Sequence, residues 1–377
     1  MSGRYLLQGR VLTPARDITC ATLLVEDGRI NWLQPGLRPA RQAEPLAEPG
    51  DTIVPGFIDL QVNGFGGCDS AAGADAVSAI SARLPEFGVT GFLPTIITRP
   101  LEEGVAFVGE VGRAAAPGAR LLGAHVEGPF LNPRFKGAHD ARLMTEPTTE
   151  RVEALLAAGP RLVTLAPELP GALEAAQRLS RAGVLVGAGH TGASFEQAQQ
   201  AVAAGVRFAT HVFNAMPTIR HREPGAVSAF LLDRRVTVGL VADGVHVAPA
   251  VMHLVVRARG GGGIALTTDQ TAAAGGPPGR YRLGDVEVIS DGRVARLLDG
   301  TLAGSAATMD HLVRQAASLA GLRRAVAMAS VAPARALRLP GLGRIGEGLP
   351  ADLVVLDTAL CVRATLIGGR LAYRRHA

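Results

Sequence analysis

The stretch TIVPGFIDLQVNGFGG, residues 52–67, begins with a short apolar run punctuated by proline and glycine and then turns polar. We interpret the run as a strand. Similar runs alternate with amphipathic segments rich in Ala, Leu, Glu and Gln, a pattern that indicates βα units around a parallel sheet. Eight candidate strands can be placed, at 53–62, 89–97, 120–128, 161–168, 183–190, 206–211, 236–246 and 263–269. Eight parallel strands close a barrel, so we expect an α/β protein with a (β/α)8 TIM barrel.

The two ends of the chain differ from the middle, because they read as short strands joined by tight turns. The candidate strands there are 4–14, 21–34, 351–357 and 361–375. An Asp27-Gly28 turn follows the first half of 21–34, and the segment 35–50 looks irregular. We therefore predict a small β-sandwich domain built from residues 1–52 and 346–377, flanking a catalytic barrel over 53–345.

Composition excludes several classes of protein. No run of about 18 apolar residues is present, and the N-terminus lacks the apolar centre of a signal peptide, so we expect a cytoplasmic protein without membrane association. Three cysteines without a CxxC pair give neither a disulfide framework nor a thiolate zinc site. The net charge is +5, but the arginines are scattered and aromatics are few, which argues against a nucleic-acid partner. A small anionic substrate explains the charge at least as well.

Polar residues close most of the candidate strands, where the chemistry of a parallel barrel is found. They are Gln61, Asn63, Glu127, Glu168, His190, His211, Asp243, His246 and Asp269. Among them, Glu127, His190 and His211 supply one carboxylate and two imidazoles, the ligand set of a catalytic zinc site with an open position. Each could instead be a satisfied polar residue at a strand end, but three at equivalent positions favour a metal site.

Other polar residues could act beside such a metal. Asp269 could take a proton from water and return it to a leaving amine, although it could equally cap the segment that follows. His139 could stabilise an oxyanion, but the residues alone favour a surface loop histidine. Arg222 and His246 suit an anion such as a phosphate. The neighbouring basic residues, Arg220 and His221, leave open which side chain points inward.

Several motifs together resemble the amidohydrolase superfamily, and within it the N-acetylglucosamine-6-phosphate deacetylase family. They are PGFIDLQVNGFGG, GAHVEGPFLNPRFKGAHD, VGAGHTGASFEQA, FATHVFNAMPTIRHREPG, GLVADGVHV, TTDQTAAAG and DGTLAGSAATM. The resemblance covers nearly the whole chain. It implies hydrolysis of the N-acetyl group of N-acetylglucosamine 6-phosphate to glucosamine 6-phosphate and acetate.

The resemblance also implies roles for individual residues. One divalent metal, zinc, would be held by Glu127, His190 and His211, with Asp269 as the catalytic acid and base and His139 binding the acetyl carbonyl. Substrate contacts would fall on Ala138, His139, Asn214, Ala215, Arg222, His246, Leu302, Ala303 and Gly304. In this family the arginine reaches the neighbouring subunit's site, so Arg222 implies a homodimer.

Three features separate this chain from close variants of the pattern. Two-metal amidohydrolases carry His-x-His after the first strand, whereas this chain has Gln61 and Asn63, so we predict one metal with these amides supporting the site. The only lysine, Lys136, follows the third strand, which excludes a carboxylated lysine bridging two metals after the fourth. The family's usual TDA is TDQ here, and Gln270 could alter substrate preference beside the base.

Three alternatives stay open on the sequence alone. The substrate could be the galactosamine 6-phosphate epimer, which differs at one hydroxyl. The protein could be a catalytically inactive sugar-phosphate sensor, although an intact base argues against this. Zinc, iron and cobalt would all accept the same ligands.

Overall fold

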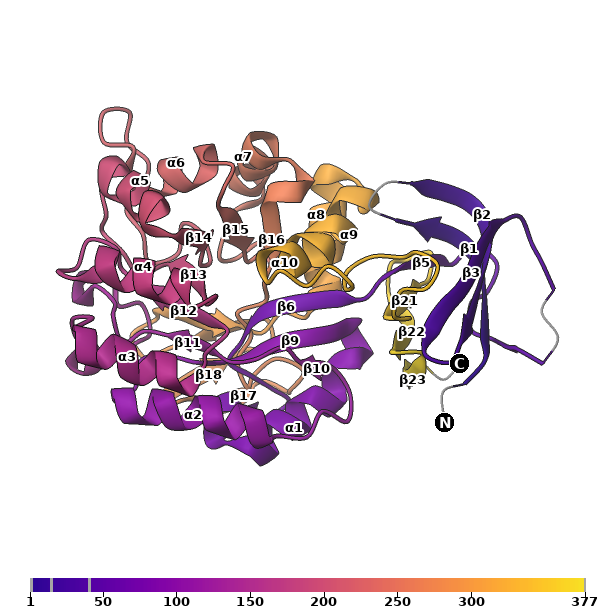
Figure 1. Cartoon of the computed structure of the whole chain (residues 1–377), viewed down its shortest axis with the longest axis horizontal. Coiled ribbons are helices and arrows are strands. Elements are labelled where there is room, and N and C mark those ends of the chain that lie inside the picture. The colour runs from indigo at the N-terminus through magenta and orange to yellow at the C-terminus, as the bar shows by residue number, and fades with distance from the viewer. Residues whose placement is uncertain (1–2, 14–15, 40–41, 376–377) are drawn as a thin grey trace.

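The computed structural model describes residues 3–13, 16–39 and 42–375. Figure 1 shows two parts: a parallel sheet ringed by helices, and a mixed sheet at the other end of the molecule that contains strands from both ends of the chain. Among the described residues, no helix combines the length and the hydropathy needed to cross a membrane.

The parallel sheet confirms the predicted eight-stranded barrel. Its strands, in spatial order, are β6 (Phe57–Val62), β9 (Val89–Ile96), β11 (His125–Glu127), β12 (Leu162–Leu165), β13 (Leu185–Ala188), β14 (Val206–Ala209), β15 (Thr237–Leu240) and β16 (Ile264–Leu266). A short strand, β10 (Arg120–Leu121), also pairs with β9. Each strand is shorter than its predicted range. At most strands, residues at the carboxyl end leave the ladder for the loops of the barrel mouth, whereas β6 ends as predicted and starts later, because residues 52–55 form β5 of the other sheet.

The barrel closes between its first and last strands through a backbone bridge and a buried carboxylate. Val62 bridges Gln270 in parallel, just past the end of β16. The fully buried Asp59 carboxylate accepts hydrogen bonds from Thr268 Oγ1 at 2.6 Å and Thr267 Oγ1 at 3.1 Å. Burial raises the pKa of Asp59 to about 6, against the effect of these hydrogen bonds. The seam between β6 and β16 is therefore held by backbone and side-chain contacts together.

Helices cover the outside of the barrel in the βα order that the sequence predicts. They are α1 (Ala74–Arg83), α2 (Leu101–Arg113), α3 (Thr149–Ala158), α4 (Ala172–Arg181), α5 (Phe195–Ala204), α6 (Gly225–Leu232), α7 (Pro249–Arg259) and α8 (Met309–Ala320). Two more, α9 (Leu322–Ala329) and α10 (Val331–Ala336), follow α8. Local sequence sets these ends: at α5 the Ser194 and Gln197 side chains cap each other's backbone N–H, and Gly205 ends the helix with φ 123°.

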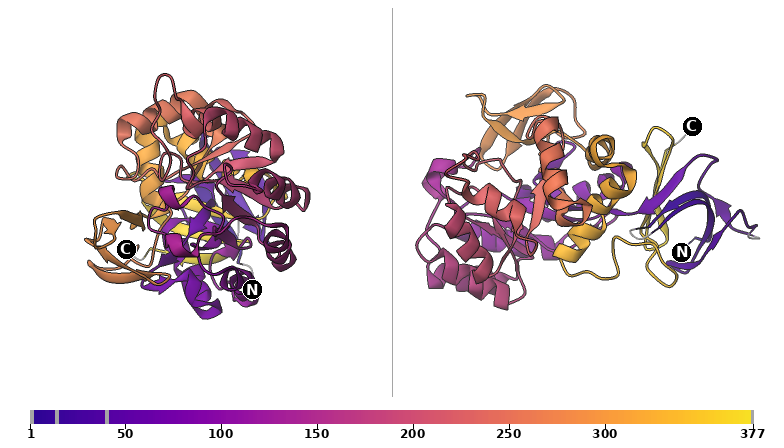
Figure 2. Two further views of the ribbon diagram at one scale, coloured as in Figure 1. Left: turned by 90° about the vertical axis from the view of Figure 1, so that its left-hand side faces the viewer. Right: turned by 90° about the horizontal axis from the view of Figure 1, so that it is seen from above.

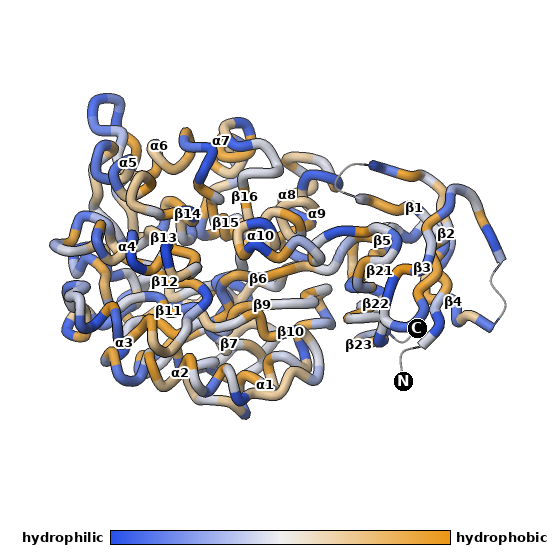
Figure 3. The backbone as a smooth tube through the Cα atoms, in the orientation of Figure 1, coloured by the Kyte–Doolittle hydropathy of each residue, from blue (hydrophilic) through white to orange (hydrophobic). Residues whose placement is uncertain are grey.

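Short elements fill the connections between these helices and strands. They are the 3-10 helices η1 (Ser70–Ala72), η2 (Leu84–Phe87), η3 (Pro133–Phe135), η4 (Ala141–Leu143) and η5 (Gly261–Gly263), and the two-residue strands β7 (Gly64–Phe65) and β8 (Cys68–Asp69). Figure 3 shows hydrophobic residues along the barrel strands and hydrophilic ones in many of the outer loops. The barrel interior holds large apolar side chains such as Phe208, Leu93 and Ile58, all buried.

The mixed sheet joins both ends of the chain. Its strands are β1 (Tyr5–Leu12), β2 (Asp17–Glu26), β3 (Arg29–Pro35), β4 (Glu44–Pro45), β5 (Thr52–Pro55), β21 (Leu353–Leu356), β22 (Val362–Ile367) and β23 (Arg370–Arg374). The joint is the antiparallel pair of β5 with β21. Asp27 and Gly28 form the predicted turn between β2 and β3, with φ 51° and 80°. The domain limits at 52/53 and 345/346 stay a prediction; residue 14 of a predicted strand and residues 40–41 of the irregular segment lie outside the described residues.

A four-stranded antiparallel sheet between β16 and α8 was not predicted. It comprises β17 (Gly279–Leu283), β18 (Val286–Ser290), β19 (Val294–Arg296) and β20 (Leu302–Ser305). In the view from above in Figure 2 it projects from one side of the barrel. Its signals were present as Gly284-Asp285, Asp291-Gly292 and Asp299-Gly300, which are turn dipeptides between alternating strands.

The barrel interior provides a test of what stabilises the fold. We expect Phe208→Ala to lower the free energy of unfolding by about 3–5 kcal/mol, because the fully buried ring would leave a cavity among residues of several strands. Urea unfolding followed by circular dichroism would measure it. Leu298→Ala is the control: this side chain is 73% exposed, so its loss should change the stability by about 0.5 kcal/mol or less. An equal loss of unfolding free energy in the two variants would contradict the view that the barrel interior stabilises the fold.

Candidate active site

The carboxyl ends of the barrel strands surround a cavity of about 260 Å³. It is lined by Asn63, Ile97, Glu127, Gly137, Ala138, His139, His190, His211, Asn214, Ala215, His246, Asp269, Leu283, Thr301, Leu302 and Gly304. Most of the residues predicted for the site are in this list. They come from the ends of seven of the eight barrel strands, or from the loops that follow them, and from the inserted sheet, so the site exists only in the folded chain.

Glu127, His190 and His211 meet at the centre of the cavity. Glu127 Oε1 lies 2.8 Å from His211 Nε2 and 3.3 Å from His190 Nε2, and the two imidazole nitrogens lie 3.2 Å apart. All three side chains are buried, and one ligand atom from each lies within 4.8 Å of the others. Two imidazoles and a carboxylate converging in this way fit a divalent metal that keeps one position open.

A backbone carbonyl fixes the orientation of His190. Its Nδ1 lies 2.9 Å from the carbonyl oxygen of Phe135, which can only accept, so Nδ1 carries the proton. In the neutral form of the ring, Nε2 carries the lone pair that a metal would bind, and this nitrogen faces Glu127 and His211. This is the arrangement by which proteins prepare a histidine to bind metal.

The two amides after the first strand contact the acidic residues of the site. Gln61 Nε2 donates to Glu127 Oε2 at 2.9 Å, so one carboxylate oxygen is engaged while the other faces the histidines. Asn63 Nδ2 donates to Asp269 Oδ1 at 2.8 Å. These contacts agree with the supporting positions predicted for Gln61 and Asn63, whose roles stay a prediction.

Burial and neighbouring charges set the protonation of the acids. Burial raises the pKa of Asp269, and Glu127 adds to the rise while His211 opposes it. Burial also opposes ionisation of Glu127, but its hydrogen bonds with His190 and His211 outweigh this and lower the pKa of the carboxyl well below its ordinary value. The site therefore holds one carboxylate of low pKa, Glu127, which suits a metal ligand, and one of raised pKa, Asp269, which suits a proton acceptor.

Three of these side chains come from strained backbone. His190, His211 and Asp269 have φ of 48°, 29° and 50°, in the left-handed region that costs a residue with a side chain about 1–3 kcal/mol. Each lies just after a barrel strand, and the reversal of φ accompanies the turn of the side chain into the mouth. Strain repeated at equivalent positions marks this end of the barrel as the functional one.

His139 and His246 are also oriented by their partners. His139 Nδ1 accepts from the Thr98 backbone N–H at 3.2 Å, which leaves the ring proton on Nε2, 3.7 Å from Glu127 Oε2. Burial, followed by the charge of His190, lowers the pKa of His139 well below its usual value, so the ring is a neutral donor. His246 Nδ1 lies 2.7 Å from Asp243 Oδ2, and the ring lines the cavity.

Some predicted residues lie elsewhere. The loop before α6 protrudes from the barrel in Figure 1. Arg222, in this loop, is exposed and lines a different hollow, together with Phe135 and Gly192. Ala303 is buried behind the wall that Leu302 and Gly304 form. Glu168, which closes the fourth strand, accepts from the Gly192 N–H and from Thr191 Oγ1 and Asn132 Nδ2, and so organises the loop around His190.

Gln270 contributes mainly its backbone. Its carbonyl oxygen accepts from the N–H groups of Asn63 and Gly64, at 2.9 and 3.1 Å, and its side chain is buried. The residue that departs from the family pattern therefore lies at the barrel seam, directly behind the base.

The sequence analysis missed several wall residues. Ile97, Gly137, Leu283 and Thr301 line the cavity but were not predicted. Thr301 stands inside the motif DGTLAGSAATM, so the resemblance could have indicated it. Leu283 lies in the inserted sheet, so its place in the cavity wall could be predicted only by predicting that sheet first.

Comparisons with known proteins agree with this geometry. A model of the amidohydrolase family matches residues 52–372. The chain is 37% identical to N-acetylgalactosamine-6-phosphate deacetylase of Escherichia coli O157:H7, over 96% of this chain and 97% of that one. It is 38% identical to N-acetylglucosamine-6-phosphate deacetylase of Danio rerio, over 86% and 85%. A solved structure of a mutant of the Mycobacterium smegmatis N-acetyl-D-glucosamine-6-phosphate deacetylase, in complex with N-acetyl-D-glucosamine-6-phosphate, superposes with a TM-score of 0.93 and 37% identity, covering 98% of this chain and 99% of that one.

Metal content tests the geometry of the cluster. We expect the purified protein to retain about one divalent metal per chain after dialysis, and His190→Ala to lower that content about tenfold or more, because one of three ligands is lost. Plasma mass spectrometry would measure it. His253→Ala, which removes an exposed histidine from α7, should keep the parental content. Two tightly held metals per chain would contradict the single site.

Proposed function

This chain belongs to the amidohydrolase family, and on that basis we propose that it hydrolyses the N-acetyl group of N-acetylglucosamine 6-phosphate to give glucosamine 6-phosphate and acetate. One observation carries the proposal: the buried Asp269 carboxylate, held by Asn63, shares one cavity with the cluster of Glu127, His190 and His211. The names of the relatives, which include N-acetylglucosamine-6-phosphate deacetylases, supply the substrate class.

The metal requirement follows from the family and from the cluster. Glu127, His190 and His211 would hold one ion, which we propose to be zinc, since two imidazoles and one carboxylate suit it. When bound, the ion supplies Lewis-acid activation of water and of the acetyl carbonyl. The hydrogen bond from Gln61 to Glu127 supports a single ion, because an amide occupies the carboxylate oxygen that a second ion would use.

Asp269 moves the proton in this mechanism. Burial raises the pKa of Asp269, so this carboxylate can accept a proton from the attacking water at neutral pH. The hydrogen bond from Asn63 to Oδ1 orients the carboxylate and leaves Oδ2 to take the proton. The water oxygen forms a bond to the acetyl carbon, and the carbonyl oxygen takes up negative charge. His139, with its proton on Nε2, stabilises that charge. Asp269 then returns the proton to the amide nitrogen as the C–N bond breaks, since a free amide anion is too poor a leaving group.

The remaining cavity residues are proposed to bind the sugar phosphate. His246, oriented by Asp243, faces the cavity and suits the phosphate, and Asn214 and Ala215 line the same cavity in the loop after His211. Ala138, Leu302 and Gly304 line the same cavity, with Ala303 immediately behind, and would close around the ring and the acetyl group.

We also propose a homodimer in which Arg222 completes the partner's site. Arg222 is exposed and lies outside the cavity of its own chain, on a loop that protrudes from the barrel. An arginine placed there suits a phosphate that a neighbouring subunit binds, because the guanidinium can contact two phosphate oxygens at once.

The galactosamine 6-phosphate epimer is the second candidate substrate. The E. coli O157:H7 relative with that name is matched over 97% of its length at 37% identity, as close as the glucosamine enzymes. A catalytically inactive sensor is less well supported, because a protein that only binds would not need Asp269 beside three metal ligands.

Acetate release tests the reaction. We expect release from N-acetylglucosamine 6-phosphate, with kcat for Asp269→Asn lower by about 10²–10⁴-fold, because the amide cannot accept the proton. N-acetylgalactosamine 6-phosphate, tested in parallel, decides between the epimers by the larger kcat/KM. Asp285→Asn is the control, since this carboxylate is exposed in the inserted sheet and should leave kcat unchanged. No release by the metal-loaded protein would favour the sensor.

Mixed dimers test the shared site. Arg222→Gln and Asp269→Asn chains, each impaired alone, are co-expressed with different tags, and the mixed dimer is isolated. If Arg222 serves the partner, one of the two sites has both residues, and kcat should return to about half that of the parent dimer. If Arg222 serves its own chain, no site in the mixed dimer is complete, and activity should stay at the level of the variants.

A further inference from the structure

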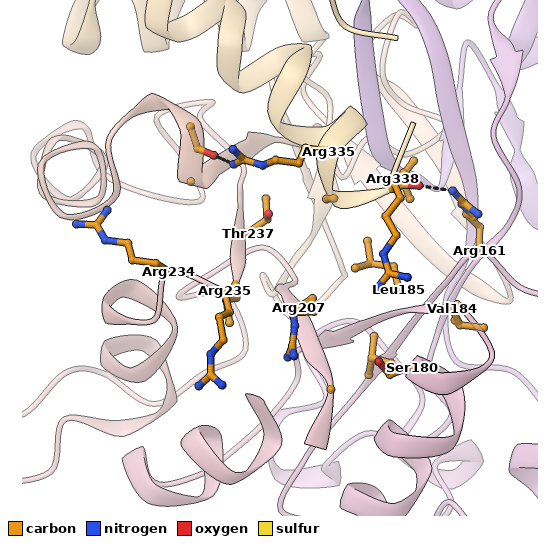
Figure 4. Close-up of a pocket in the computed structure, with 18 of the residues that line it drawn as sticks. Arg161, Ser180, Val184, Leu185, Arg207, Arg234, Arg235, Thr237, Arg335 and Arg338 are labelled. Carbon is orange, nitrogen blue, oxygen red and sulfur yellow. Dashed lines mark hydrogen bonds between the residues drawn. The ribbon is translucent and has the colours of Figure 1, made fainter. Parts of the chain in front are cut away.

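A second cavity lies at the opposite end of the barrel from the site. Its volume is about 780 Å³, and residues at the amino-terminal ends of the strands line it, among them Leu185, Arg207 and Thr237. The segment 335–338, at the end of α10, covers part of it (Figure 4). None of the residues proposed for catalysis lines this cavity.

The wall is unusually rich in one kind of side chain. Seven arginines line it: Arg161, Arg207, Arg234, Arg235, Arg259, Arg335 and Arg338. No acidic residue is among the described residues of the wall, and within those residues only Arg235 has a carboxylate partner, the Asp233 side chain at 2.7 Å. The cavity therefore carries a large excess of positive charge.

Most of these arginines are held by neutral groups. Arg207 donates to the carbonyl oxygens of Val202 and Val206, each at 2.7 Å, while Arg161 and Arg335 donate to those of Leu337 and Gly262. A backbone carbonyl positions a guanidinium but leaves its charge uncompensated. Arginines elsewhere differ: Arg10, Arg120 and Arg363, for example, each pair with a carboxylate.

Arg259 shows how crowded the charges are. It is 4% exposed and donates to the carbonyl oxygens of Leu231, Asp233 and Val236, while its buried Nε has no partner among the described residues. Burial lowers the pKa of its guanidinium, and the nearby charges of Arg234 and Arg335 lower it further, while the charge of Asp233 opposes them. A bound anion would relieve this repulsion.

Arg338 is the side chain most available to a ligand. It is exposed, and within the described residues its guanidinium has no hydrogen bond or ion pair. Its backbone has φ 54°, in the left-handed region. Figure 4 shows Arg335 and Arg338 along one side of the cavity and Arg207, Arg234 and Arg235 along another, so positive groups surround the space rather than form one point.

We propose that this cavity binds a small anion that carries two or more linked phosphate groups. One guanidinium group can bind two phosphate oxygens at once. Several guanidinium groups spread around a cavity of this size therefore suit a chain of linked phosphates better than a single phosphate. The apolar residues Val184, Leu185 and Val236 also line the cavity, and they could contact an organic group attached to the phosphates. This site is separate from the proposed catalytic cavity and does not depend on the proposed reaction.

Calorimetric titration of the full-length protein at about 0.15 M salt tests the proposal with inorganic phosphate, pyrophosphate and tripolyphosphate as probes. The affinity should rise along this series, by about tenfold or more from phosphate to tripolyphosphate. The double variant R207Q/R338Q should lose about tenfold in tripolyphosphate affinity. Arg293→Gln, which removes an exposed arginine of the inserted sheet, and His246→Gln, in the catalytic cavity, should both keep the parental affinity.

The outcomes separate the possible readings. If the double variant has a lower melting temperature than the parent, the single variant Arg338→Gln decides, because the Arg338 side chain contacts no other described residue through a hydrogen bond or ion pair. Its affinity for tripolyphosphate should fall by about threefold. Equal affinity for the three probes, an equal loss in Arg293→Gln, or a loss only in His246→Gln would overturn the proposal. So would a random RNA oligonucleotide that binds more tightly than tripolyphosphate through the same arginines, since the surface would then serve a nucleic acid.

Discussion

The rest of the site depends on the contacts that the buried Glu127 carboxylate makes with its neighbours. Its Oε1 faces the two imidazoles and its Oε2 accepts from Gln61, so three other strand ends must converge on one buried charge. An ionised group that is 2% exposed persists only when its neighbours compensate for the lost water. The barrel satisfies this demand by bringing β6, β11, β13 and β14 to the same mouth, and the left-handed residues at the strand ends turn the side chains inward.

Much of this arrangement could be predicted from sequence because parallel strands impose it. A polar residue that ends a buried apolar run must lie at the mouth, so Glu127, His190, His211 and Asp269 followed from their positions along the chain. The partners of the two amides did not follow. Nothing local indicates that Gln61 reaches Glu127 or that Asn63 reaches Asp269, because those contacts depend on the twist and closure of the whole barrel.

The parts that could not be predicted are those where the chain leaves the βα repeat. The inserted sheet adds Leu283 to the wall of the cavity through an antiparallel pairing of strands that lies outside the alternation of strands and helices in the barrel. The arginines of the second cavity come from several separate stretches of the sequence and were interpreted as scattered charges. They gather because the starts of neighbouring parallel strands, such as β14 and β15, lie side by side and the ends of α7 and α10 lie against them.

The pairing of β5 with β21 has a consequence for synthesis of the protein. Ile53 pairs with Val355, so β5 finds this partner only in a strand that is synthesised after the whole barrel. The hairpin of β2 and β3 can form early from local contacts, but one edge of β5 stays open until the barrel has been made. An open strand edge invites pairing with other chains, so β5 is exposed to aggregation during synthesis until β21 covers it.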